Sequence, residues 1–144
     1  MIILILNIIY DADIDGLFPV KKTLGNEIRR KSREVLKGEK KKTDFINIRF
    51  TDDNTITAYN KKYLSHNKRT DIITFNYGEE GLIEGDIIIS LDTISDNSKR
   101  YNVCFEMEIM RVVIHGILHL CGYEDKNRKL KQQMHEREDY YLNN

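Results

Sequence analysis

Two histidines, His115 and His119, lie four residues apart in the apolar stretch VVIHGILHLCGYED, which covers residues 112–125. Residues at this spacing share one face of a helix, with β-carbons about 5–6 Å apart, so the two imidazoles could bind one metal ion. Their apolar neighbours disfavour a charged imidazolium and favour the neutral ring that a metal requires. A second interpretation stays open, in which two core histidines each hydrogen-bond to a carbonyl or a carboxylate.

A third ligand must come from outside this helix. Gly122 predicts the end of the helix and lets the chain turn back, which brings Glu124 and Asp125 within reach of the ion. We expect Asp125 to be the third ligand, with Glu124 and His135 as the alternatives. Both carboxylates would also suit the N-terminus of a following helix, so a capping role is the competing interpretation.

Two imidazoles and one carboxylate leave a coordination position open, which is typical of a catalytic zinc site. We therefore expect one divalent transition metal ion and predict zinc, although these ligands also suit Fe(II). Zinc in such a site lowers the pKa of bound water to about 7. The histidine spacing is that of the HExxH metalloprotease helix, but Gly116 replaces the glutamate that would act as general base. We interpret Gly116 as leaving space beside the metal, and a protease is not predicted.

The whole chain has the length and composition of one folded domain. Its 144 residues can bury a core without help from a metal, and 23 basic residues balance 23 acidic ones. Residues 21–42 hold ten Lys or Arg against three Glu, an excess that suits either a polyanion or a solvated helix face. Cys104 and Cys121 are too few for a disulfide scaffold, and we expect both to be reduced and buried.

The apolar start of the chain is predicted to be a strand rather than a leader. It lacks the basic region and the small-residue cleavage site of a signal peptide. No stretch approaches the ~20 apolar residues that span a bilayer. These features predict a soluble, cytoplasmic protein that does not use a membrane.

The elements that must position the two histidines follow from apolar periodicity. We expect strands over residues 2–9, 44–51, 71–77 and 82–91, and the last two should form a hairpin or lie side by side. We expect helices over residues 17–36, 52–64, 91–102, 107–121 and 127–141. The expected helix boundaries are Asp13 or Asp15, Asp52 or Asp53, Gly38 and Gly122.

Three consecutive isoleucines, Ile87, Ile88 and Ile89, indicate a central strand with both faces covered. The predicted fold is one α+β domain over residues 1–144, with one mixed sheet of about four strands packed with helices. The metal site should lie at the C-terminal end of a buried helix.

Three blocks of the sequence resemble the YbeY family, the metal-dependent single-strand endoribonucleases of ribosomal RNA maturation. HGILHLCGYED resembles the family signature HGxLHLxGYDH. Residues 60–75, NKKYLSHNKRTDIITF, and residues 85–90, GDIIIS, resemble its NxxYR…TDVLSF and GDIxIS segments. The resemblance implies a cytoplasmic endoribonuclease of ribosomal RNA processing and ribosome maturation. It also implies single-stranded RNA, a ribosomal subunit and ribosome-associated proteins as partners.

Carried over by position, the resemblance makes His115 and His119 metal ligands and places Asp125 where the family usually has a third histidine. The family arginine after NxxY is Leu64 here, so a cation for the scissile phosphate must come from elsewhere. The candidates for this phosphate clamp are Arg69 and His66. The candidate RNA-binding residues are Lys61, Lys62, Lys68 and Arg111, of which Arg111 could equally pair with a carboxylate.

A non-catalytic assembly factor is the alternative function. Such a protein would bind RNA or the ribosome and use the metal to hold its last two helices together, and the loss of the family arginine at Leu64 favours it. Chelator-sensitive cleavage of single-stranded RNA would separate the two functions. For a nuclease, the sequence leaves open whether a metal-activated water or the RNA's own 2′-hydroxyl attacks the phosphodiester.

Overall fold

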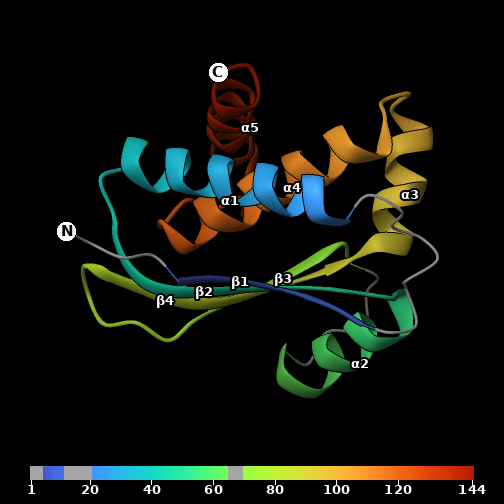
Figure 1. Cartoon of the computed structure of the whole chain (residues 1–144), viewed down its shortest axis with the longest axis horizontal. Coiled ribbons are helices and arrows are strands. Elements are labelled where there is room, and N and C mark those ends of the chain that lie inside the picture. The colour runs from blue at the N-terminus through green and yellow to red at the C-terminus, as the bar shows by residue number, and fades with distance from the viewer. Residues whose placement is uncertain (1–4, 12–20, 65–69) are drawn as a thin grey trace.

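The computed structural model describes residues 5–11, 21–64 and 70–144 (Figure 1). Its four strands are β1 (Ile5–Tyr10), β2 (Lys42–Thr51), β3 (Ile72–Asn76) and β4 (Leu82–Ser90), and they form one sheet in the order β1-β2-β4-β3. β1, β2 and β4 run parallel, whereas β3 pairs antiparallel with β4. The predicted α+β fold with one mixed sheet of about four strands is confirmed.

Helices cover both faces of this sheet (Figure 1). One face carries α1 (Lys21–Gly38) and α4 (Phe105–Leu120), and α4 contacts both β3 and β4. α3 (Leu91–Arg100) packs on α4, and α5 (Arg128–Leu142) packs on α4 and α1. Of the helices that the structure describes, α2 (Asp53–Leu64) is the one on the other face, where it packs against β3 and β4.

The central strand β4 is buried on both faces, as its run of isoleucines predicts. Ile87 and Ile89 are fully buried in the main core, among side chains of the sheet, α1 and α4. Successive side chains of a strand point to opposite faces, so Ile88 packs on the α2 side, with Ile56 and Ile73. The sheet therefore separates a large core from a small one.

Where both fall within the described residues, the predicted boundaries lie within two residues of the observed ones. α4 begins at Phe105 rather than Met107, and Cys104 at its start is exposed, so the prediction that both cysteines are buried is wrong for Cys104. Cys121 is buried, and burial raises the pKa of its thiol to about 12. Residues 2–4, 17–20, Asp13 and Asp15 lie outside the described residues.

The ends of α1 and α2 show which capping residues act. Asp52 caps α2, since its Oδ1 accepts a hydrogen bond from the Thr55 N–H at 2.7 Å. At the end of α1 the left-handed residue is Lys40, with φ of 57°, and not Gly38. Gly38 has a packing role instead, because a β-carbon there would lie 2.3 Å from the hydroxyl oxygen of Tyr141.

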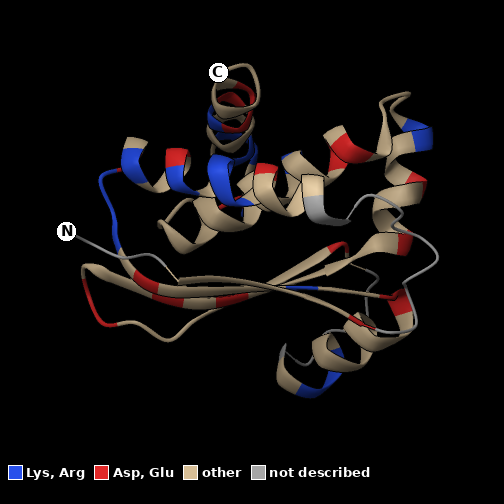
Figure 2. Ribbon diagram, viewed as in Figure 1, with Lys and Arg blue, Asp and Glu red and all other residues tan. Residues whose placement is uncertain are grey.

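Part of the basic excess of residues 21–42 is used within the fold. Arg30 pairs with Glu27 and Glu34 along the exposed face of α1, whose charges of both signs are visible in Figure 2. The buried Lys31 amine donates to the backbone oxygen of Tyr141 at 2.7 Å, near the end of α5. The solvated-face interpretation therefore accounts for this part of the helix. Among the described residues, no helix combines the length and the apolar character needed to cross a membrane.

Gly116 faces the sheet and not the metal ligands, which corrects the interpretation that it leaves space beside the metal. A β-carbon at this position would lie 2.7 Å from Cδ1 of Ile72 and 3.1 and 3.2 Å from two methyl carbons of Ile87. The absence of a side chain thus lets α4 approach β3 and β4 closely. The same contact leaves no room for the glutamate of an HExxH helix.

We expect Gly116→Ala to destabilise the fold by about 1 kcal/mol, because overpacking costs about 1–3 kcal/mol and outweighs the roughly 1 kcal/mol gain in helix propensity. Urea denaturation in the presence of a chelator measures this loss without a contribution from bound metal. Ile72→Val removes the clashing Cδ1, so the double variant should lose less stability than the sum of the two single variants. Additive losses would show that this contact does not limit the packing.

Candidate metal centre

His115, His119 and Asp125 come together at the C-terminal end of α4, where the sequence places them. The two Nε2 atoms lie 3.0 Å apart. Oδ2 of Asp125 lies 3.6 Å from Nε2 of His115 and 3.5 Å from Nε2 of His119. Tetrahedral ligands about 2.0–2.1 Å from one zinc ion are about 3.3 Å from one another. The three side chains could therefore hold one ion with small adjustments.

Hydrogen bonds at the outer ring nitrogens determine which tautomer each histidine adopts. Nδ1 of His115 lies 3.2 Å from a carboxylate oxygen of Glu138, and Nδ1 of His119 lies 3.0 Å from the backbone oxygen of Tyr123. A carboxylate and a carbonyl can only accept, so each Nδ1 carries a proton and donates it. Each neutral ring then directs the lone pair of Nε2 into the site.

Two Nε2 lone pairs that face each other at 3.0 Å repel unless a cation lies between them. A proton on one ring would supply this cation at low pH. Burial, followed by the charge of His115, lowers the pKa of His119, while Asp125 acts in the opposite direction. The neutral form is thus favoured near neutral pH, and the arrangement suits a metal ion better than a pair of ordinary core histidines.

The loop after α4 brings Asp125 to the site. Gly122 has φ of 110°, and the N–H of Tyr123 donates to the carbonyl of Leu118 at 3.0 Å, which reverses the chain. The N-cap of α5 is Asn127, which accepts from a backbone N–H, so the capping interpretation of Asp125 is wrong. The carboxylate of Asp125 is free to face the two rings, and at 43% exposure it opens the site to solvent.

The two alternative ligands lie outside this group. Glu124 is exposed, and its carboxylate pairs with Lys126 at 3.2 Å. His135 has a side chain 68% exposed, and its Nδ1 lies 3.4 Å from Glu138 on the same helix. Neither residue shares the cluster of ligand atoms, all within 4.8 Å of one another, that joins the other three side chains.

Glu138 is the residue of this site that sequence reasoning missed. Its carboxylate is buried. It accepts a hydrogen bond from Nη1 of Arg111 at 3.3 Å and another from the ring of His115. A second buried carboxylate, that of Glu108, accepts a hydrogen bond from Nε of Arg111 at 2.9 Å. One signal was available, because Met134, Glu138 and Tyr141 share one face of a mostly polar helix and a carboxylate on a buried face needs a partner.

The pairing interpretation of Arg111 is therefore confirmed, and a contact of this residue with RNA stays a prediction. Lys61 and Lys62 are exposed at the end of α2, on the other face of the sheet, so the structure does not bring them to the metal ligands. Arg69, His66 and Lys68 lie outside the described residues. Asp71, directly before β3, interacts electrostatically with His115 and Arg111. Burial raises the pKa of its carboxyl group, and the charges of these two residues counteract this rise.

A second network holds the loop that carries the Tyr123 carbonyl. The Tyr123 hydroxyl donates to Glu39 at 2.7 Å, and Glu39 also accepts from Arg137 and the Tyr141 hydroxyl. Burial alone would raise the pKa of Glu39, but hydrogen bonds from Tyr141, Arg137 and Tyr123 prevail and lower it. A lowered folded-state pKa stabilises the fold above the unfolded-state pKa, and this stability is lost as the pH falls through the folded-state value.

Glu138→Gln should lower zinc affinity by about 10–100-fold, because the anionic acceptor that orients the His115 ring becomes a neutral one. A competition titration against a chromophoric chelator measures the change. Glu136→Gln is the matched control, since Glu136 lies on the same helix but is exposed and bonds only to Gln132 among the contacts described. Equal zinc affinities of the two variants would contradict an orienting role for Glu138.

Comparison with known proteins agrees with this site. The family model for endoribonuclease YbeY matches residues 18–144. The endoribonuclease YbeY of Flavobacterium johnsoniae is 44% identical over 105 residues, which cover 73% of this chain and 76% of that protein. The endoribonuclease YbeY of Chlorobaculum parvum is 39% identical over 123 residues, which cover 85% and 87%.

A solved structure shows the same fold. The solution structure of TM1509 from Thermotoga maritima aligns with a TM-score of 0.66 at 30% identity, and the match covers 96% of this chain and 87% of that one. The resemblance seen in the three sequence blocks is thereby confirmed. The chain belongs to the YbeY family of endoribonucleases.

Proposed function

We propose that the protein is a metal-dependent endoribonuclease that cleaves single-stranded RNA. Membership of the YbeY family supports the activity and the substrate class. The observation that carries the metal dependence is the pair of Nε2 atoms, 3.0 Å apart, whose ring protons are already used at Nδ1. Zinc is the proposed ion, because two imidazoles and a carboxylate are ordinary zinc ligands.

The charge and the fixed geometry of the site suit an anionic substrate. A bound divalent ion supplies Lewis-acid stabilisation of the negative charge that develops on phosphate oxygens. Glu138 and the Tyr123 carbonyl hold the two rings in one tautomer and one orientation. Asp125 adds one negative charge, so the three ligands and a divalent ion together carry a net charge of about +1, which attracts phosphate.

Ribosomal RNA is the proposed target in the cell, with the ribosomal subunit and ribosome-associated proteins as partners and the cytoplasm as the compartment. The resemblance to the maturation nucleases supports these assignments. Arg111 is neutralised by Glu108 and Glu138, so a phosphate clamp must come from another residue. Arg69 and His66 remain the proposed candidates.

Asp125→Asn distinguishes a metal-binding role of Asp125 from a structural role in capping α5. The change replaces an anionic oxygen with a weak amide donor, so zinc affinity should fall by at least about 10–100-fold. The stability of α5 should not change, because Asn127 caps that helix. The reciprocal control, Asn127→Ala, should cost about 1 kcal/mol of stability and leave zinc affinity intact. An Asp125→Asn protein that binds zinc as tightly as the parent would point to Glu124 or His135.

The activity itself is tested on a labelled single-stranded RNA. The zinc-loaded protein should cleave it, a chelator should stop cleavage, and added zinc should restore it. His119→Ala should lose the metal and reduce cleavage by roughly a hundredfold or more, as loss of a transition-state electrostatic contact does. Circular dichroism verifies that this variant is folded. RNA binding without chelator-sensitive cleavage would instead identify a non-catalytic assembly factor.

A further inference from the structure

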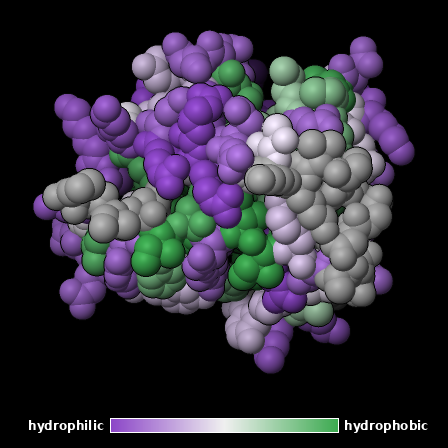
Figure 3. Space-filling view, viewed as in Figure 1, coloured by the Kyte–Doolittle hydropathy of each residue, from purple (hydrophilic) through white to green (hydrophobic). Residues whose placement is uncertain are grey.

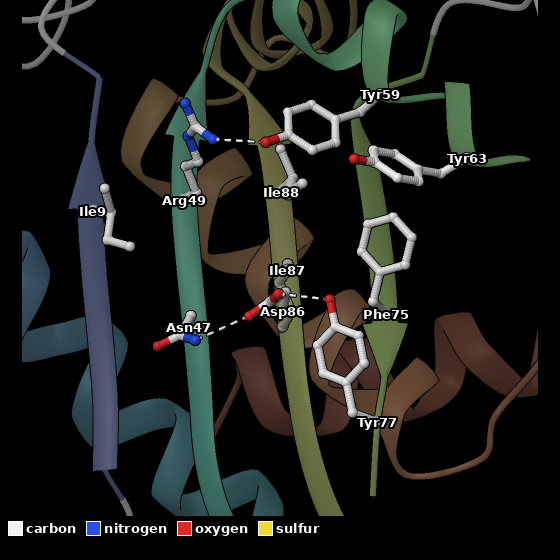
Figure 4. Close-up of a pocket in the computed structure, with 10 residues that line it drawn as sticks. All are labelled: Ile9, Asn47, Arg49, Tyr59, Tyr63, Phe75, Tyr77, Asp86, Ile87 and Ile88. Carbon is white, nitrogen blue, oxygen red and sulfur yellow. Dashed lines mark hydrogen bonds between the residues drawn. The ribbon is translucent and has the colours of Figure 1, made fainter. Parts of the chain in front are cut away.

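A pocket of about 470 Å³ opens on the face of the sheet opposite α4, beside α2 (Figure 4). Asn47, Arg49 and Asp86 form its polar floor, and they alternate along β2 and β4 with the buried side chains of the main core. Four aromatic side chains form its wall. These four, Tyr59, Tyr63, Phe75 and Tyr77, together with the three polar residues, define what we call the aromatic pocket.

Three rings of the aromatic pocket form a row that runs from α2 to the end of β3. Figure 4 shows Tyr63, Phe75 and Tyr77 one after another, with ring centroids 6.1 and 6.3 Å apart. Tyr63 and Tyr77 are 55% and 57% exposed, so their ring surfaces face solvent. Exposed rings on a sheet are the means by which several RNA-binding domains stack two or three unpaired bases.

Hydrogen bonds hold two of the four rings, Tyr59 and Tyr77, in place without a ligand. The Tyr77 hydroxyl donates to Asp86 at 2.7 Å, and the Asn47 amide donates to the other carboxylate oxygen at 2.9 Å (Figure 4). Arg49 donates to the Tyr59 hydroxyl at 3.0 Å. Partial burial and the Asp86 carboxylate raise the pKa of Tyr77 to about 12, so its hydroxyl stays a donor at neutral pH. A ligand therefore meets Tyr59 and Tyr77 rings that are already held by hydrogen bonds, which lowers the entropic cost of binding.

The charges around the aromatic pocket complement a nucleotide. Lys62 is exposed, its ammonium lies 5.2 Å from the centroid of the Tyr63 ring, and it forms no ion pair within the part of the chain that the structure describes. Asp86 accepts from two neutral donors and has no cationic partner among the described residues. A nucleotide offers a phosphate for Lys62 and base N–H groups for the carboxylate.

We propose that the aromatic pocket binds unpaired bases of a single RNA strand, which stack on Tyr63, Phe75 and Tyr77. The inference rests on the proposed action on RNA, and it adds a binding site on the face of the sheet away from the metal centre. The row of exposed rings favours bases over a protein partner, because every base has a flat face that can stack on an aromatic ring. Figure 3 shows hydrophobic side chains on the side of the molecule along which β1 runs. Ile5 and Ile9 of β1 are 51% and 46% exposed, and Ile9 also lines the aromatic pocket.

Replacement of the rings tests this site. Binding of fluorescein-labelled oligocytidine to the zinc-loaded protein is measured by anisotropy directly after stopped-flow mixing, before cleavage. Tyr63→Leu and Tyr77→Leu should each weaken binding about tenfold, the order expected for one lost base stack. Tyr77→Phe keeps the ring and should bind nearly as the parent does. Tyr101→Leu is the matched control, since Tyr101 is also 57% exposed but lies at the end of α3. Zinc content should be the same in all four variants.

Several outcomes would overturn the inference. If the parent cleaves RNA and both leucine variants bind it as tightly as the control, the aromatic pocket does not bind RNA, and the proposed function survives. If the parent neither binds nor cleaves RNA, both proposals fail. If light scattering shows a dimer that Tyr77→Leu dissociates, the face is an interface between copies.

A second test uses the unaltered protein, so its result does not depend on whether the substituted proteins fold. With a chelator present to stop cleavage, oligocytidine should shift the methyl resonances of Ile9 and Ile88, which line the aromatic pocket, in NMR spectra. Shifts confined to residues around His115 and His119 would contradict the second binding site.

Discussion

The close approach of α4 to the sheet at Gly116 is the constraint on which the metal centre depends. Without a side chain at this position, the helix packs directly on Ile72 and Ile87. His115, its neighbour along the helix, then faces away from the sheet toward Glu138 on α5. His119 lies one turn further, where the loop after Gly122 returns to it. One packing contact thus decides which face of the helix carries chemistry.

The second constraint is the cost of buried charge around α4 and α5. Glu108 and Glu138 are both buried, and the guanidinium of Arg111 lies between them. Removal of one partner from such a group typically costs about 3–5 kcal/mol, whereas apolar replacements of the whole group can be neutral. Stability alone therefore does not require these charges. Their use is to hold an anionic acceptor at a defined place behind the His115 ring, which a hydrophobic core could not do.

The two faces of the sheet serve different purposes. One face buries the isoleucines of β2 and β4 under α1 and α4 and gives the metal centre a rigid base. Among the described elements, α2 covers part of the other face, and polar and aromatic side chains line a pocket there beyond the small cluster of Ile56, Ile73 and Ile88. The antiparallel edge strand β3 contributes to both faces, since Ile72 contacts α4 and Phe75 lines the aromatic pocket.

The sequence alone determined the parts of this protein that depend on local patterns. Helical spacing predicts that His115 and His119 share a face, a glycine predicts the turn that returns Asp125, and the isoleucine run predicts a strand covered on both sides. These features involve residues near in sequence, where periodicity and turn chemistry act directly. The family signature strengthens the same assignments.

Only the tertiary structure decided the contacts between distant residues. Glu138 lies 23 residues beyond His115 and meets it because α5 packs on α4. Asp125 and Asn127 are equal candidates for a helix cap by composition, and the path of the loop makes Asn127 the cap. The direction of Gly116 and the row of rings from α2 and β3 likewise depend on how elements pack. A sequence pattern shows which face of a helix is apolar, but only packing determines what that face meets.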